Sequence, residues 1–220
     1  MRILSQCVAV SMVLVLSMSL VQASGAERSR EVMIYVFDKS SPSHCHLCLI
    51  NGEVGFVTTN QSGRPPKQPA AAPLPDYSRL FVQDGKMLRV GKPEGRVLTR
   101  SVKVGNEVRT SEKYVEPSKE LVAKTGWYLT ADYSTTPPRV VLTKKPTKTS
   151  AWEFVHAKAD IRDDEASAAY IKNINGRGMA VWLSVADKPI VYKDGSQVRN
   201  LTLASVKKTI LVVVEANGGR

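Results

Sequence analysis

Three short runs decide the fold class: Gly126-Trp-Tyr-Leu-Thr-Ala131, then Arg139-Val-Val-Leu-Thr143, then Trp152-Glu-Phe154. Each is rich in β-branched or aromatic residues, and polar, proline-containing segments separate them, as is typical of strands joined by turns. The rest of residues 76–216 has the same character, so an all-β fold is expected. The best helix candidate is Asp163-Asp-Glu-Ala-Ser-Ala-Ala169, whose acidic start suits the helix dipole.

A weak internal repeat runs through residues 76–216. Leu88, Leu129 and Leu183 occupy equivalent places in three successive units, each of which continues into further strand-like runs. Units in which a Tyr-Leu or Trp-Leu strand leads to a Val-Val-Leu strand and an aromatic closing strand resemble the β-trefoil family. The resemblance implies that the three units share one core. The tryptophans are expected to fill that core: Trp127, Trp152 and Trp182. No glutamine has a tryptophan two residues later, so a ricin-type sugar site is not implied.

A second resemblance covers residues 79–135. Met87-Leu-Arg-Val-Gly91, Val102-Lys-Val-Gly-Asn-Glu-Val108 and Thr125-Gly-Trp-Tyr-Leu-Thr-Ala-Asp-Tyr133 look like the strands of a bacterial Src-homology-3-like wall-binding module. The chain lacks the asparagine of that pattern and has a long intervening segment at residues 109–124. This resemblance implies binding to a cell-wall polymer.

Residues 1–26 have the layout of a cleaved secretory signal peptide. Arg2 supplies a positive start, Val8 to Leu20 is an uncharged apolar run, and small residues lead to Ala26. The run is too short to span a bilayer comfortably. We therefore expect an extracytoplasmic protein, periplasmic or secreted, with no transmembrane segment after processing. Cys7 would be removed with the signal.

The remaining chain divides by composition into four zones. Residues 27–60 predict an N-terminal β segment that holds a cysteine pair, and Asn51-Gly52 between two apolar runs indicates a hairpin turn. Residues 61–75 are rich in proline and read as a linker. Residues 76–216 form the trefoil-like domain, and residues 217–220 are expected to be a frayed tail.

Charge narrows the class of partner. The chain has 31 Lys and Arg against 20 Asp and Glu, a formal net charge of +11. This excess favours acidic partners, such as an anionic polysaccharide or another envelope component, over neutral ones. A protein is the other class of partner that the sequence leaves open. Aromatic residues are few, which disfavours binding of single-stranded nucleic acid.

The densest chemical cluster is the Cys-His-Leu-Cys run at residues 45–48. Cys45, Cys48 and His46 could hold a metal ion, although a second pair of ligands is missing. A thiol-redox site would need a helix after the first cysteine, and the sequence there predicts a turn. A c-type haem site would need histidine where Leu49 stands. The remaining interpretation is a Cys45–Cys48 disulfide or two structural thiols in an oxidising compartment.

No motif of a hydrolase, metalloprotease or phosphate-binding loop is present, so no catalytic residue and no cofactor is assigned. The sequence therefore favours a secreted or periplasmic non-catalytic binding protein for an anionic glycan, an envelope component or a protein. Two alternatives stay open. One is an exported thiol-redox or metal-binding protein that uses Cys45 and Cys48, and the other is a wall-binding module.

Overall fold

The computed structural model describes residues 29–37, 45–58, 76–105, 107–159, 161, 166–174, 178–193 and 195–216. The predicted signal peptide, the 61–75 linker and the 217–220 tail lie outside these residues. The strands are β1 (Arg30–Val36), β2 (Cys45–Ile50), β3 (Glu53–Thr58), β4 (Tyr77–Ser78), β5 (Phe81–Asp84), β6 (Met87–Val90), β7 (Arg96–Val104), β8 (Glu107–Val115), β9 (Tyr128–Asp132), β10 (Arg139–Thr143), β11 (Glu153–His156), β12 (Ala166–Ile174), β13 (Ala180–Val185), β14 (Ile190–Val191), β15 (Gln197–Ala204) and β16 (Leu211–Glu215). The short helices are α1 (Lys119–Ala123) and the 3₁₀-helix η1 (Lys148–Ser150). The all-β prediction is confirmed.

Seven strands close into an antiparallel barrel in the order β1-β16-β12-β13-β15-β3-β2. The ring closes where Tyr35 and Val36 of β1 pair with His46 and Cys45 of β2. On its other side, β1 pairs with β16 over five residues. Closure leaves these seven strands with neighbours on both sides over part of their length, which removes the open edges of a flat sheet.

Strands on both sides of the predicted linker therefore belong to one barrel. The 27–60 segment supplies β1, β2 and β3, and the third repeat unit supplies β12, β13, β15 and β16. The first two repeat units supply no strand to the ring. A trefoil is not confirmed, because the three units do not contribute equivalent strands.

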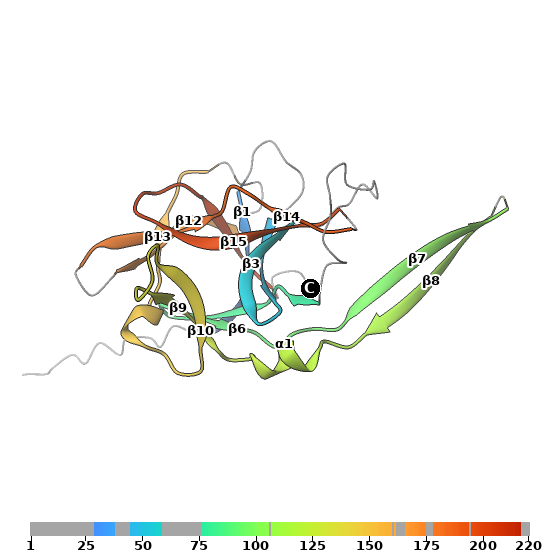
Figure 1. Cartoon of the computed structure of the whole chain (residues 1–220), viewed down its shortest axis with the longest axis horizontal. Coiled ribbons are helices and arrows are strands. Elements are labelled where there is room, and N and C mark those ends of the chain that lie inside the picture. The colour runs from blue at the N-terminus through green and yellow to red at the C-terminus, as the bar shows by residue number, and fades with distance from the viewer. Residues whose placement is uncertain are drawn as a thin grey trace, which may run out of the picture.

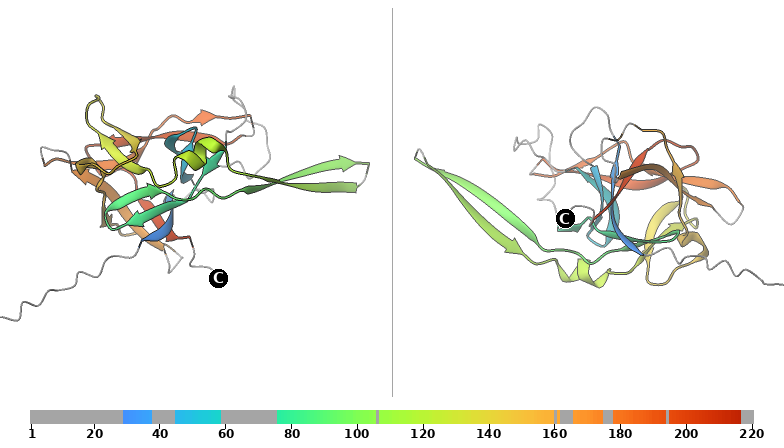
Figure 2. Two further views of the ribbon diagram at one scale, coloured as in Figure 1. Left: turned by 90° about the horizontal axis from the view of Figure 1, so that it is seen from below. Right: turned by 180° about the vertical axis from the view of Figure 1, so that it is seen from behind.

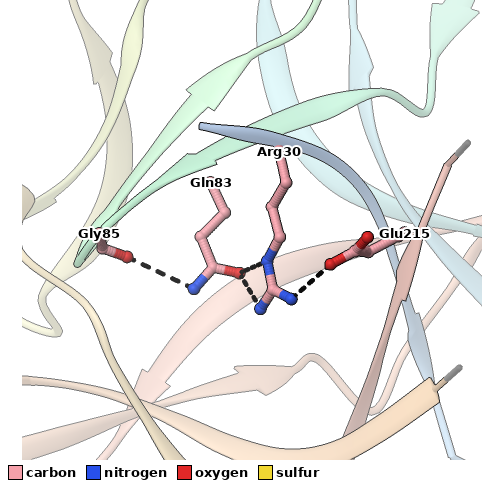
Figure 3. Close-up of polar contacts among 4 residues, drawn as sticks. All are labelled: Arg30, Gln83, Gly85 and Glu215. Atoms are coloured by element: carbon pink, nitrogen blue, oxygen red, sulfur yellow. Dashed lines mark hydrogen bonds and ion pairs between the residues drawn. The ribbon is translucent and has the colours of Figure 1, made fainter. Parts of the chain in front are cut away.

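The first two units form an extension of the barrel. β5 pairs with β1 at residues 30–32, and the sheet continues through β6 and β9 to β10. Arg30 stabilises this junction, as Figure 3 shows: its guanidinium donates to Gln83 Oε1 at 2.9 and 3.1 Å and to Glu215 Oε1 at 2.7 Å. Gln83 in turn donates to the carbonyl oxygen of Gly85 at 3.4 Å. One side chain on β1 thus connects the extension to the barrel.

β7 and β8 form a separate two-stranded ribbon that projects away from the barrel (Figures 1 and 2). Helix α1 follows the ribbon, and the Ser118 hydroxyl caps it by accepting a hydrogen bond from the Leu121 amide. Ser before an apolar helical turn is an N-terminal signal that the strand-dominated prediction passed over.

The Asn51-Gly52 turn is confirmed. Both residues have positive φ, 50° and 77°, and they join β2 to β3 with Ile50 opposite Glu53. This two-residue connection matches the right-handed twist of its strands, and asparagine and glycine tolerate its backbone at low cost. The helix expected over residues 163–169 is wrong for its described part, because Ala166 to Ala169 lie in β12. The start of that stretch lies outside the described residues.

The core fills the barrel and the space under its extension. One cluster contains the interior side chains of the barrel, such as Ile34, Leu47 and Phe56, together with Trp152. Trp152 is fully buried, as expected, whereas Trp127 and Trp182 are only half-buried. In the described part of the chain, no helix is both long and apolar enough to cross a membrane.

Candidate functional site

A cavity of about 610 Å³ lies at one end of the barrel, where β1, β13 and β3 end and β2, β15 and β16 begin. Ligand sites in β-barrels commonly occupy such a mouth. Its lining is mixed in polarity, with Val36, Phe37, Cys45, Thr58, Val185, Asp187, Gln197, Arg199, Lys208, Thr209 and Ile210. The cavity therefore offers a few polar groups against apolar walls.

The pairing register places three polar side chains in one row across the mouth. Cys45 of β2 lies opposite Thr58 of β3, and Thr58 lies opposite Gln197 of β15. Residues directly opposite each other in a sheet point to the same face. Since Leu47 and Leu49 follow Cys45 at intervals of two and belong to the core, this face is the barrel interior.

Arg199 lies one step deeper in the barrel than this row. It pairs with Phe56, a fully buried residue of β3, and it precedes Leu201 and Leu203 on the interior face of β15. A long cationic side chain is thereby directed from the barrel wall toward the mouth. Its charge acts on Cys45 in the row above, where it opposes part of the rise in the thiol pKa that burial causes.

The segment before β16 completes the rim. Lys208, Thr209 and Ile210 line the cavity there, opposite Asp187 after β13. Thr209 is held by a 3.0 Å hydrogen bond between its hydroxyl and that of Ser184, and the Phe37 amide donates to the Ile210 carbonyl oxygen at 2.9 Å. The rim is thus fixed by bonds to two barrel strands. The described charged groups of the whole cavity are the cations of Arg199 and Lys208 and the carboxylate of Asp187.

Burial raises the pKa of Cys45, and the hydrogen bond from Thr58 and the charge of Arg199 only partly offset this effect. Burial also raises the pKa of Cys48, with Arg79 opposing it. Both cysteines lie in a strand rather than at a helix N-terminus, so no helix dipole adds to the weak opposing effect of these arginines. Both thiols are therefore protonated at neutral pH.

The structure does not bring the predicted cysteine pair together. Cys45 and Cys48 are three residues apart in β2, so they point to opposite faces, and both are free. Cys48 packs outside the barrel with Ile50, Val57 and Val198. His46 also faces outward, and its ring lies 5.9 Å from that of Tyr35. Within the described ranges, no group of three or more ligating side chains could hold a metal ion.

Cys45 is the predicted site residue that lies in the cavity. Sequence reasoning missed Gln197 and Arg199, although a signal for them exists. In Gln197-Val-Arg-Asn-Leu-Thr-Leu203 the apolar Leu201 and Leu203 alternate with the polar Asn200 and Thr202. Once Leu201 and Leu203 are assigned to the core, Arg199 must face inward as well. No family profile matches the chain, and no curated protein or solved structure matches it either.

Proposed function

We propose that this protein is a non-catalytic binding protein that works outside the cytoplasm and binds an acidic group of an envelope glycan in the barrel mouth. The observation that carries the proposal is the inward-facing Arg199 in a cavity whose rim also carries Lys208. A guanidinium presents paired donors that match carboxylate, sulfate or phosphate oxygens. Asp187 is the single carboxylate among the described lining residues, so cations are in excess.

The other lining groups suit a sugar ring. Thr58, Thr209 and Gln197 supply hydroxyl and amide groups that can exchange hydrogen bonds with ligand hydroxyls. Val36, Phe37 and Ile210 supply apolar surface beside them. Such a mixture gives orientation through a few polar contacts and affinity through burial.

Binding is better supported than chemistry at the Cys45 thiol. The thiol is protonated because burial raises its pKa more than Thr58 and Arg199 lower it, and its strand position provides no helix N-terminus that would activate it. The described lining contains no histidine and no second carboxylate to act with Asp187. In this proposal the Cys45 thiol is a small lining group of the cavity and takes no part in a reaction.

Isothermal titration with oligogalacturonate, a polymer of acidic sugars, tests the proposal. Arg199→Gln is expected to weaken binding about tenfold to a hundredfold, the effect of removing a charged hydrogen-bonding partner. Lys208→Gln should weaken oligogalacturonate binding less than Arg199→Gln does. Raised salt should weaken binding by the wild type. Neutral maltooligosaccharides should bind much more weakly.

Arg109→Gln is the matched control, because Arg109 is an exposed arginine on the distant β7–β8 ribbon. It removes the same charge from the whole protein and should leave binding unchanged. Equal losses in Arg199→Gln and Arg109→Gln would show that net charge, and not the cavity, attracts the polymer. Absence of any binding by the wild type would contradict the proposal for acidic sugars.

A further inference from the structure

A cluster of aromatic and cationic side chains lies on the outer face of β12 and β13. The rings of Tyr170 and Trp182 meet edge to face, with centroids 6.1 Å apart. The Lys207 ammonium lies 5.4 Å from the Tyr170 ring and 4.9 Å from the Trp182 ring. Lys172, opposite Trp182 in the sheet, lies 5.9 Å from the same indole and pairs with Glu153 at 3.1 Å. Among the described side chains of this cluster, Glu153 therefore offsets the charge of Lys172, and no carboxylate pairs with Lys207.

Large apolar side chains are exposed around this cluster. Ile174, two residues beyond Lys172 on the same face of β12, is 49% exposed. Met179 is 57% exposed and precedes Ala180, which pairs with Ile174. Val206, next to Lys207, is 55% exposed. In Figure 1 the β12–β13 hairpin lies on the side of the molecule away from the β7–β8 ribbon.

We propose that this outer face docks on the surface of an anionic phospholipid bilayer. Ile174, Met179 and Val206 would enter the boundary between headgroups and acyl chains, where exposed apolar side chains gain most from leaving water. Tyr170 and Trp182 would lie behind them at headgroup depth, which aromatic rings with a polar edge prefer. The aliphatic part of the Lys207 side chain would lie along this apolar surface, and its ammonium group would extend to the lipid phosphates.

The charge of the protein favours a lipid surface over a neutral apolar partner. The net charge of +11 attracts the whole chain to a negative surface, and Lys207 adds an exposed cation at the docking face. At a protein interface on this face, the Lys207 ammonium would be removed from water, which costs free energy. At a bilayer surface, the ammonium stays in the hydrated headgroup layer.

Sedimentation with vesicles tests the proposal on the folded chain without its predicted signal. Vesicles containing phosphatidylglycerol should bind the protein, and pure phosphatidylcholine vesicles should bind it at least tenfold more weakly. The double variant Ile174→Ser, Met179→Ser should lower the partition coefficient on phosphatidylglycerol about tenfold or more. Lys207→Gln should lower it about fivefold, the effect of one lysine near a charged membrane.

The matched control is Val97→Ser, Tyr114→Ser, which removes two equally exposed apolar side chains, 55% and 59%, from the β7–β8 ribbon. It should leave vesicle binding unchanged. Tryptophan emission should shift to the blue on binding, and Trp182→Phe should abolish the shift.

The proposal is overturned if the wild type does not bind phosphatidylglycerol vesicles or if the two double variants lose binding equally. Arg199→Gln separates it from the proposed cavity function, since this variant should bind vesicles normally. Loss of vesicle binding in Arg199→Gln alone would assign the lipid phosphate to the barrel mouth and refute docking through the outer face.

Discussion

The indole Nε1 of Trp152 donates a 2.9 Å hydrogen bond to the carbonyl oxygen of Leu129. The donor lies between η1 and β11, and the acceptor lies in β9 of the extension. Both side chains are fully buried in the cluster that also fills the barrel. The backbone amide of Trp152 bonds to the Lys86 carbonyl oxygen at 2.6 Å, which fixes the ring on the β5–β6 turn as well. One residue thus joins the extension to the core.

Trp152→Ala is expected to lower the free energy of unfolding by about 3–5 kcal/mol, because it leaves a large cavity and an unpaired carbonyl oxygen. Guanidinium denaturation followed by circular dichroism measures the change. Trp127→Ala is the control, since Trp127 is half-buried beneath Lys124, whose ammonium lies 3.6 Å from the ring centroid. Trp127→Ala should lower the free energy of unfolding by only about 1 kcal/mol. Equal costs in the two variants would contradict the assignment of Trp152 to the core.

Tyr133→Phe should destabilise the protein by about 1–2 kcal/mol at neutral pH. The Tyr133 hydroxyl donates at 2.7 Å to Oδ1 of Asn173, whose Nδ2 bonds to the carbonyl oxygens of Thr149 and Ala151 at 2.9 and 2.7 Å. Asn173 is almost fully buried, so the loss leaves one acceptor without a donor. Chemical denaturation of both proteins under matched conditions gives the difference.

The hydrogen bond between Tyr133 and Asn173 also predicts that the free energy of unfolding depends on pH. Burial raises the pKa of Tyr133 from 10.0 to about 12. The unfolded chain then releases this proton first, so the wild type keeps the full contribution below pH 10.0 and loses it as the pH rises toward 12. The difference in unfolding free energy between wild type and Tyr133→Phe should therefore decrease over this pH range. A gap that stays constant would argue against a buried Tyr133 hydroxyl.

A fragment that covers residues 76–220 is not expected to fold alone. It lacks β1, β2 and β3, which are three of the seven strands in the ring. Its β15 and β16 would then present unpaired edges and apolar interior faces to water. Proton–nitrogen NMR spectra of the fragment should show poor dispersion, whereas residues 27–220 should give a dispersed spectrum. A cooperative thermal transition in the fragment would contradict the shared barrel.

The two cysteines should behave as unreactive free thiols. Ellman's reagent at neutral pH should modify Cys45 slowly and Cys48 more slowly still, because Cys48 is fully buried. Both thiols should react fast after unfolding in guanidinium without reductant. The rate at Cys45 should still be rising at the ordinary thiol pKa of 9.0, because burial raises its pKa and the thiolate fraction levels off only above the pKa. Fewer than two thiols in the unfolded exported protein would point to the disulfide.

Local patterns predicted the parts of the fold that depend on neighbouring residues. The alternation of apolar residues gave the strand class, and Asn51-Gly52 gave its turn because only a few residues adopt that backbone. The pairing of β1 with β16 joins residues 32–36 to residues 211–215, and the sequence of neither segment alone predicts which strand is its partner. The repeat pattern over residues 76–216 therefore suggested a symmetry that long-range pairing did not produce.

The candidate site was predictable only in part, for a related reason. The cysteine cluster was recognised by residue type, but its outcome depends on strand phase: Cys45 and Cys48 fall on opposite faces because three is an odd spacing. Arg199 was hidden among thirty-one basic residues. Its direction toward the cavity follows from the register with Phe56, which connects distant segments.

The neighbouring positions of β1 and β16 have a consequence for the order of events during synthesis. β1 emerges from the ribosome long before residues 211–215, yet it needs them as its partner over most of its length. The ring therefore cannot close on a nascent chain, and high contact order makes its closure slow. Because the ring stays open until β16 is made, the nascent chain keeps its barrel strands unpaired, which is the state that the predicted export across a membrane would need.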